Sequence, residues 1–155
     1  MKKVILSLLG AAVLFTTAAP SISASEVNLE SEVNQVLGTP YLWGGTTSIG
    51  FDCSGFILYV LKKFNVEDLP RTSQSQAKVG TPVAKENLRS GDLVFFNTLG
   101  TGISHAGIYL GDDQFAHSSS SKGVRISKLA DTYYKDRYVT ARRVVDQKSY
   151  LSMVN

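Results

Sequence analysis

The spacing of apolar residues changes halfway along the chain. In the first half they recur at three- and four-residue steps, over residues 26–37 and again from Phe56 to Phe64, as on the buried face of a helix. A further short helix is expected within residues 127–137. Helices followed by strands favour one α+β domain, in which the antiparallel sheet packs on the second helix. The strands are predicted from short apolar runs bounded by Gly, Asp, Asn and Ser, at residues 93–96, 106–110, 114–117 and 139–145.

Cys53 is the only cysteine of the chain, and it lies where an irregular, glycine-rich stretch becomes the second helix. A lone thiol cannot form an internal disulfide, so in a protein exported to an oxidising compartment, as the N-terminus described below predicts, chemistry is the best reason to keep one. At the start of a helix, unpaired backbone N–H groups favour the thiolate, and the side chain of Asp52 can cap the same turn. We therefore interpret Cys53 as a nucleophile rather than as a small core residue.

The two histidines of the chain, His105 and His117, lie on successive predicted strands. A histidine beside a cysteine can accept the thiol proton and later protonate a leaving amine, and His105 is the better candidate for this role. On its strand, His105 shares a face with Gly107, which leaves space beside the imidazole. A two-residue turn at residues 112–113 would set His117 opposite Ile108, so a looser turn or a bulge is needed to bring His117 beside His105.

A metal site is the sharpest alternative for these residues. One thiolate and two imidazoles, from Cys53, His105 and His117, are able to hold zinc or copper. However, the sequence has no closely spaced ligand pair such as Cys-x-x-Cys or His-x-x-x-His. We expect neither a metal nor another cofactor. The plainest alternative is that all three are ordinary core residues.

The N-terminus has the three-part order of a secretory signal peptide. Two lysines precede an apolar run from Val4 to Ala19, and Pro20 is followed by small residues that suit cleavage after Ala24. A membrane anchor is less favoured, because a helix of 16 residues spans only about 24 Å of a hydrocarbon core about 30 Å thick. We expect a signal peptide at residues 1–24 and one domain at residues 25–155, exported to the periplasm or cell wall without stable membrane insertion.

Charge gives no argument for a nucleic-acid partner. The whole chain carries a formal charge of +3, but two of its lysines belong to the predicted signal peptide. The remaining domain is nearly neutral, so it has no electrostatic means of attracting nucleic acid or an anionic membrane surface. We expect no nucleic-acid partner, and we expect a monomer.

Five short motifs follow one another along the chain: TPYLWGG at 39–45, FDCSGF at 51–56, LPRTSQSQ at 69–76, RSGDLVFF at 89–96 and SHAGIYLG at 104–111. In this order they resemble the NlpC family of bacterial cell-wall cysteine peptidases, which share a compact papain-like fold. The resemblance covers roughly residues 30–145. Any one motif alone would be weak, whereas five in order are specific.

The resemblance implies roles for individual residues. Cys53 matches the nucleophile, His105 the general base, and His117 the polar group that orients His105. Tyr41 matches a tyrosine that helps the oxyanion or the substrate. The remaining substrate contacts implied by the match are Asp52, Ser54, Arg71 and Ser73, with Arg71 assigned to a substrate carboxylate.

The same resemblance implies a substrate. The family commonly hydrolyses the amide between the side-chain carboxyl of D-glutamate and the diamino acid of peptidoglycan stem peptides. We therefore expect an exported cysteine endopeptidase that acts on peptidoglycan peptides through a thioester acyl-enzyme. Three alternatives stay open: an amidase or acyltransferase on the same scaffold, a secreted antibacterial toxin, and a non-catalytic wall-binding module. The last has no need of Cys53 together with both histidines.

Overall fold

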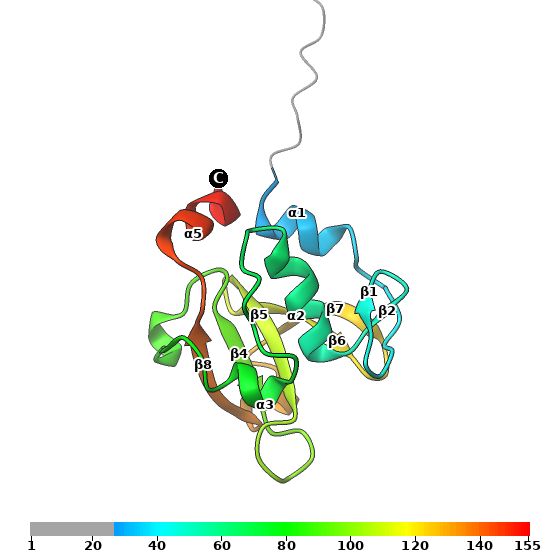
Figure 1. The fold of residues 1–155 in the computed structure, drawn as a ribbon. Helices are drawn as coiled ribbons and strands as arrows, with labels where there is room; N and C mark the ends of the chain where they lie inside the picture. Colours follow the sequence, from blue (N-terminus) through cyan, green and yellow to red (C-terminus); the bar gives the residue numbers. More distant parts are fainter. Residues whose placement is uncertain (1–26) are drawn as a thin grey trace, which may run out of the picture.

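A six-stranded antiparallel sheet runs through the molecule, with its strands in the order β3-β8-β4-β5-β6-β7 (Figure 1). The computed structural model describes residues 27–155, and the predicted signal peptide lies outside the described residues. The helix-and-antiparallel-sheet architecture expected from the sequence is confirmed. The strands of this sheet are β3 (Thr81–Pro82), β4 (Leu93–Phe96), β5 (His105–Gly111), β6 (Gln114–Ser119), β7 (Gly123–Lys128) and β8 (Tyr138–Arg143).

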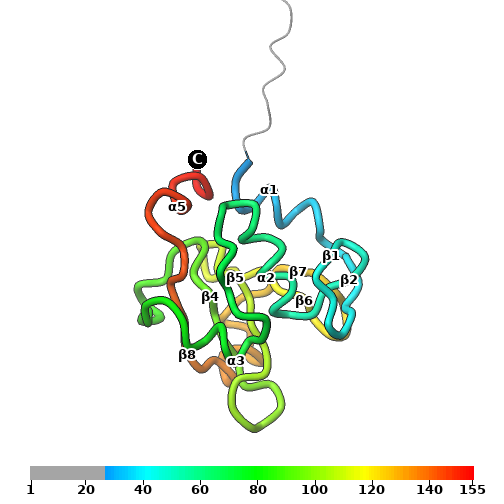
Figure 2. Tube along the Cα trace, in the orientation of Figure 1, coloured from blue at the N-terminus to red at the C-terminus, as the bar shows by residue number. Residues whose placement is uncertain are grey.

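Most of the helices lie on one face and at one end of this sheet, and a short helix packs on the other face. Helix α2 lies across β5 and β6, while α1 and the C-terminal α5 contact each other at the end of the molecule where the described chain begins (Figures 1 and 2). No helix within residues 27–155 has the length and apolar character needed to cross a bilayer. The remaining elements are α1 (Leu29–Asn34), α2 (Cys53–Lys62), α3 (Ser73–Gln76), α4 (Thr132–Lys135), α5 (Gln147–Val154), a 3-10 turn (Lys85–Asn87) and the small hairpin of β1 (Thr46–Thr47) and β2 (Gly50–Phe51).

Helix α2 begins at Cys53 because Asp52 caps it. The Asp52 backbone is extended, and its Oδ1 accepts a hydrogen bond of 2.7 Å from the N–H of Gly55, which satisfies one of the unpaired donors of the first turn. The helix then buries an apolar face against the sheet, as the periodicity predicts, through Phe56, Ile57, Val60 and Leu61.

The two faces of the sheet are packed differently. Alternate residues of β4 point to opposite sides, so Leu93 and Phe95 join the core under α2, whereas Val94 and Phe96 join a second, smaller core. Aromatic side chains dominate the second core, and Phe96 lies 5.0 Å from Phe115 between ring centroids. All four residues of β4 are fully buried, so this strand is covered on both faces.

The hairpin between β5 and β6 forms by the predicted two-residue turn. Asp112 and Asp113 both have positive φ, at 49° and 66°, and Gly111 pairs with Gln114. The register then shifts between Tyr109 and Gly111, so Ile108 pairs with Ala116. This bulge supplies the one-residue shift that the sequence required. Because of it, His117, the residue after Ala116, lies opposite Gly107 rather than opposite Ile108.

The observed elements differ from the predicted ones in three places. The strand β7 was not predicted, and it occupies the first two residues of the helix expected within residues 127–137; only α4 is helical there. The first helix is also shorter than residues 26–37, because it has six residues and leaves Val27 57% exposed. Helix α5 was not predicted from the sequence.

We expect Gly55→Ala to destabilise the protein by about 1–3 kcal/mol, although alanine is normally favoured over glycine in a helix by about 1 kcal/mol. A Cβ at Gly55 would overlap the backbone carbonyl oxygen of Gly45, so the glycine-rich loop and α2 could no longer approach each other. Urea denaturation measures the effect. Gly100→Ala is the comparison: Gly55 is helical and its substitution is opposed by a steric overlap, whereas Gly100 has a positive φ of 86° that strains an alanine but no atom near its Cβ position. A larger loss at Gly100 would contradict the steric argument.

Candidate active site

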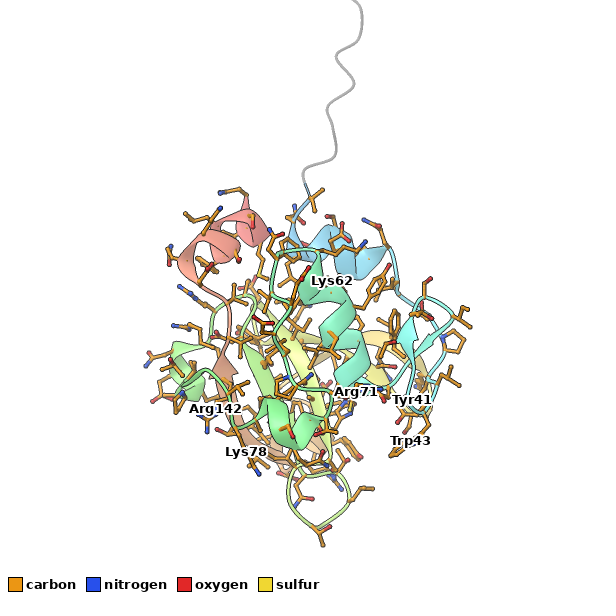
Figure 3. All side chains as sticks on the ribbon, in the orientation of Figure 1. Tyr41, Trp43, Lys62, Arg71, Lys78 and Arg142 are labelled. Carbon is orange, nitrogen blue, oxygen red and sulfur yellow. The ribbon has the colours of Figure 1, made fainter. Side chains whose placement is uncertain are left out.

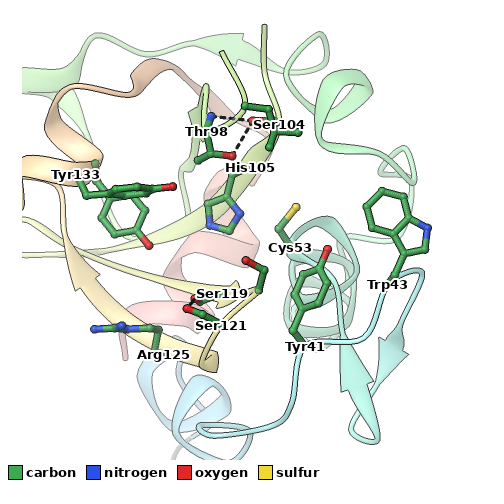
Figure 4. Close-up of a pocket in the computed structure, with 13 residues that line it drawn as sticks. Tyr41, Trp43, Cys53, Thr98, Ser104, His105, Ser119, Ser121, Arg125 and Tyr133 are labelled. Atoms are coloured by element: carbon green, nitrogen blue, oxygen red, sulfur yellow. Dashed lines mark hydrogen bonds between the residues drawn. The ribbon is translucent and has the colours of Figure 1, made fainter. Parts of the chain in front are cut away.

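A cavity of about 520 Å³ lies where the start of α2 meets the start of β5. Figure 4 shows Cys53 and His105 in its middle, Tyr41 and Trp43 toward one end, and Tyr133 and Arg125 toward the other. The structure therefore brings the predicted nucleophile and base into one cavity. The remaining lining residues are Thr98, Leu99, Ser104, Ser119, Ser120, Ser121 and Tyr134.

Cys53 is the first residue of α2 and is only partly exposed. Burial raises the pKa of its thiol; the backbone N–H of Ala106 opposes this rise, and the charge of Asp52 adds to it. The N–H groups of Ser54 and of Cys53 itself, at the helix start, lower the pKa further, as the sequence predicts, but burial outweighs them. The start of the helix, which was expected from the sequence to favour the thiolate, therefore does not by itself lower the pKa of this thiol.

The two histidines contact each other directly. His105 Nε2 lies 2.9 Å from His117 Nδ1, and the rings are nearly perpendicular. The bulge in β5 makes this contact possible. Strand β6 fills the space that the sequence predicted beside Gly107, because a Cβ at that glycine would lie 3.3 Å from the Cβ of His117. The contact also leaves Nδ1 of His105 as the ring nitrogen that can exchange a proton within the cavity.

A buried polar chain continues behind His117. This histidine is fully buried, and its Nε2 lies 2.9 Å from the hydroxyl oxygen of Ser127 and 3.4 Å from that of Tyr134. If His117 Nε2 carries the proton and donates to Ser127, then His117 Nδ1 accepts the proton of His105 Nε2. This pattern gives His105 Nδ1 a lone pair, as a base for the thiol requires. Ser127 and Tyr134 were not anticipated, because no motif connects them to His117.

Burial keeps both histidines neutral. It lowers the pKa of His105 to about 4. It also lowers the pKa of His117 to about 2, where the charges of His105 and Arg125 contribute. A neutral His117 remains a hydrogen-bond acceptor for His105 over the whole physiological pH range.

Asp52 and Arg71 form an ion pair next to Cys53. The guanidinium donates from Nη2 to Asp52 Oδ2 at 2.6 Å and from Nη1 to Oδ1 at 3.0 Å, and it also donates to the hydroxyl of Ser54 at 2.9 Å. Figure 3 shows Arg71 and Tyr41 near the same end of α2. The fork that the sequence assigned to a substrate carboxylate is thus already occupied by Asp52.

The other predicted substrate contacts differ in position. Tyr41 lines the cavity, and burial raises the pKa of its phenol, with the charges of Cys53 and Asp52 adding to the rise, so the hydroxyl stays a proton donor. Ser73 is buried at the start of α3 and is not part of the cavity wall, and neither are Ser54 and Arg71. Conversely, Trp43 lines the cavity while 87% exposed, a role that its place in the glycine-rich loop did not reveal.

The proposed metal ligands do not form a cluster suited to a metal. Within residues 27–155, no group of three or more His, Cys, Asp or Glu side chains is arranged to hold an ion. His105 Nε2 and His117 Nδ1 face each other at hydrogen-bond distance, which leaves no room for a cation between them.

We expect the free energy of unfolding to decrease as the pH falls from about 6.5 toward 4. Both histidines have folded pKa values below their unfolded value, so in this range the unfolded chain binds more protons than the folded one. Each histidine contributes a slope of at most about 1.4 kcal/mol per pH unit, and full stability is present above about pH 7. Urea denaturation at a series of pH values measures the slope.

Two variants distinguish the contribution of the histidines to this pH dependence from that of the carboxylates. His117→Asn should have a shallower slope than the parent protein. Ser127→Ala should lose stability at every pH, because it removes the hydrogen-bond partner of His117, yet it should keep the slope. Equal slopes for the parent and His117→Asn would show that His117 is not neutralised by the fold.

The chain has clear relatives among known proteins. A model of the NlpC/P60 family matches residues 38–143. The gamma-DL-glutamyl hydrolase of Bacillus subtilis (strain 168) is 43% identical over 123 residues, which cover 78% of this chain and 30% of that protein. The murein DD-endopeptidase MepS/murein LD-carboxypeptidase of Escherichia coli (strain K12) is 44% identical over 110 residues, 71% of this chain and 58% of that protein.

The solved structures agree with the sequence match. The crystal structure of an NlpC/P60 family protein from Bacillus cereus ATCC 10987 superposes with a TM-score of 0.69 at 35% identity, covering 78% of this chain and 41% of that one. The chain thus spans less than two thirds of each of these three proteins. On the sequence match, the fold and the order of the motifs, the chain belongs to the NlpC/P60 family.

Proposed function

We propose that this protein is an exported cysteine endopeptidase that hydrolyses peptidoglycan stem peptides, with Cys53, His105 and His117 as its catalytic triad. The observation that carries the proposal is the chain of polar contacts that runs from His105 to Ser127. His105 Nε2 lies 2.9 Å from His117 Nδ1, His117 Nε2 lies 2.9 Å from the hydroxyl oxygen of Ser127, and His105 lines the cavity that also contains the thiol of Cys53. When His117 donates to Ser127, this chain leaves His105 Nδ1 the lone pair that a base requires. A wall-binding module has no use for such an arrangement.

In the first half of the reaction, Cys53 Sγ attacks the carbonyl carbon of the amide while its proton passes to His105 Nδ1. The carbonyl electron pair moves to oxygen, where the hydroxyl of Tyr41 can donate a hydrogen bond. The intermediate then collapses, the C–N bond breaks, and His105 gives its proton to the leaving nitrogen. Water attacks the resulting thioester with His105 as base, and the C–S bond breaks to restore the thiol.

His117 acts through His105. When His105 becomes an imidazolium, its Nε2–H donates to the neutral His117 Nδ1, which fixes the ring orientation and stabilises the positive charge. The thiol and imidazole are both neutral at rest, so the proton transfer is coupled to attack on the substrate rather than completed beforehand.

Asp52, Ser54, Arg71 and Ser73 have less direct roles in this proposal. The Asp52–Arg71 pair and Ser54 would hold the turn that carries Cys53 from outside the cavity wall, and Arg71 could still offer the acyl half of the peptide the N–H donors that Asp52 and Ser54 do not use. Ser73 would support α3 rather than touch the substrate. Export would depend on residues 1–24 as the signal peptide.

The names of the relatives support the substrate class. One is a gamma-DL-glutamyl hydrolase and another is a murein endopeptidase and carboxypeptidase. We infer that this chain cleaves the bond between the γ-carboxyl of D-glutamate and the diamino acid of the stem. An amidase or acyltransferase with the same acyl-enzyme is the alternative, and it differs only in the nucleophile that resolves the thioester.

We expect Cys53→Ala and His105→Ala to abolish hydrolysis of purified peptidoglycan, each to a similar extent, because residues that act as a unit lose their effect together. His117→Asn should retain more activity, since an amide can still accept from His105. Release of soluble fragments measures the activity, and circular dichroism checks the fold. A fully active Cys53→Ala variant would overturn the proposed function, and an active His105→Ala with an inert His117→Asn would reverse the two histidine roles.

The bond itself can be identified by mass spectrometry of the released fragments. We expect L-alanyl-D-glutamate on the acyl side and new amino termini at the diamino acid, from peptidoglycan with diaminopimelate or with lysine. Incubation with an added amine distinguishes hydrolysis from transfer, because a transferase would incorporate the amine into the acyl product. Fragments cut only at D-alanyl cross-links would contradict the γ-glutamyl assignment but not the peptidase.

A further inference from the structure

Arg125 is a cation in the cavity without an anionic partner. It lies on β7 directly opposite His117, is half-buried, and lines the same cavity as Cys53 and His105. Among residues 27–155, its side chain makes neither a hydrogen bond nor an ion pair, whereas Arg71 and Arg143 are each paired with an aspartate. A half-buried guanidinium is therefore available for a ligand.

The rest of this end of the cavity suits an anion. No aspartate or glutamate lines the cavity, so nothing there competes for Arg125. The nearby lining residues carry hydroxyl groups, from the turn Ser119–Ser121 and from Tyr133 and Tyr134, and hydroxyls donate hydrogen bonds to carboxylate oxygens. The two arginines thus differ in availability, because the guanidinium of Arg71 is paired with Asp52 and that of Arg125 has no carboxylate partner within residues 27–155.

The position of Arg125 also indicates which half of a substrate it meets. Figure 4 shows it on the side of His105 away from Cys53, beneath Tyr133. The acyl half of the substrate is bonded to Cys53, and the amine half leaves past His105, which protonates it. A group beyond His105 therefore faces the leaving half of the peptide.

We propose that Arg125, with the hydroxyls of Ser119–Ser121 and Tyr134, forms a carboxylate subsite for the amine-side residue of the substrate. This inference rests on the proposed function and refines it. The substrate class is then a peptide whose leaving amino acid carries a free carboxylate close to the scissile nitrogen, and a carboxamide at that position should be a poor substitute. Arg125 also carries the positive charge that helps to keep His117 neutral, so it is coupled to the triad by charge as well.

The test compares two γ-glutamyl peptides that differ only in the amine-side residue, a free carboxylate in one and a carboxamide in the other. We expect the parent protein to prefer the carboxylate by about tenfold or more in kcat/KM, the range of a charge-assisted hydrogen bond. In Arg125→Met, which keeps the apolar stem, this ratio should approach one, and in Arg125→Lys it should be intermediate. The ratio is insensitive to any general loss of activity.

Lys128→Met is the matched control, because it removes one positive charge from an exposed position of the same strand outside the cavity. It should keep the parent ratio. A parent protein that cleaves both peptides equally, or an Arg125→Met variant that keeps the preference, would overturn the subsite.

A binding measurement keeps the subsite testable apart from catalysis. The Cys53→Ala variant, titrated by calorimetry with the amine-side product, should bind the carboxylate form more tightly than the carboxamide, and adding Arg125→Met should remove the difference. Suppose that binding prefers the carboxylate form and that this preference depends on Arg125, but that the protein with Cys53 intact does not hydrolyse the peptides. This result would uphold the subsite and contradict the proposed function. Equal binding of the two forms would overturn the subsite alone.

Discussion

The carboxylate of Asp52 holds together the parts of the chain on which the site depends. It caps α2 through the N–H of Gly55, accepts the N–H of Gly44 from the glycine-rich loop, and pairs with Arg71 from the segment before α3. Burial alone would raise its pKa, but these hydrogen bonds outweigh burial and lower it. The stabilisation is thus complete at neutral pH and is lost only in acid, as the pH falls through the folded pKa.

The histidine pair depends on a different constraint, the bulge in β5. Without the one-residue shift, His117 would lie opposite Ile108 and point to the face of the sheet covered by α2. With it, His117 lies on the face of His105 and under the aromatic core of Phe96, Phe115 and Tyr134. The positive φ values of the hairpin turn set where this register begins.

Burial has opposite consequences for positioning and for ionisation. The apolar surroundings hold the histidines in one arrangement, yet they also disfavour the charged forms of Cys53 and His105. The site therefore rests as a neutral chain of donors and acceptors, and charge develops only when a substrate provides an oxyanion to be stabilised. Arg125 and Tyr41 lie on opposite sides of Cys53 and His105, and they are groups that can interact with that charge or with the substrate.

Sequence patterns determined much of this protein. The helix start at Cys53, the buried face of α2, the order of motifs, the two-residue turn and the need for a bulge all follow from local rules of capping, period and turn chemistry. The lone cysteine and the two histidines were singled out from the sequence, and the family resemblance then gave each a role; the structure brings Cys53 and His105 into one cavity and joins the two histidines by a hydrogen bond.

Only the tertiary structure decided which polar groups meet. Arg71, which the resemblance assigned to a substrate carboxylate, is paired with Asp52, whereas Arg125 was overlooked on a strand that was itself not predicted. Ser127 and Tyr134 meet His117 although they come from β7 and α4, and burial raises the pKa of the Cys53 thiol despite the helix start that opposes the rise. Local sequence rules set the conformation of each segment, but ion pairing and pKa depend on which groups the fold brings together and on how much water it excludes.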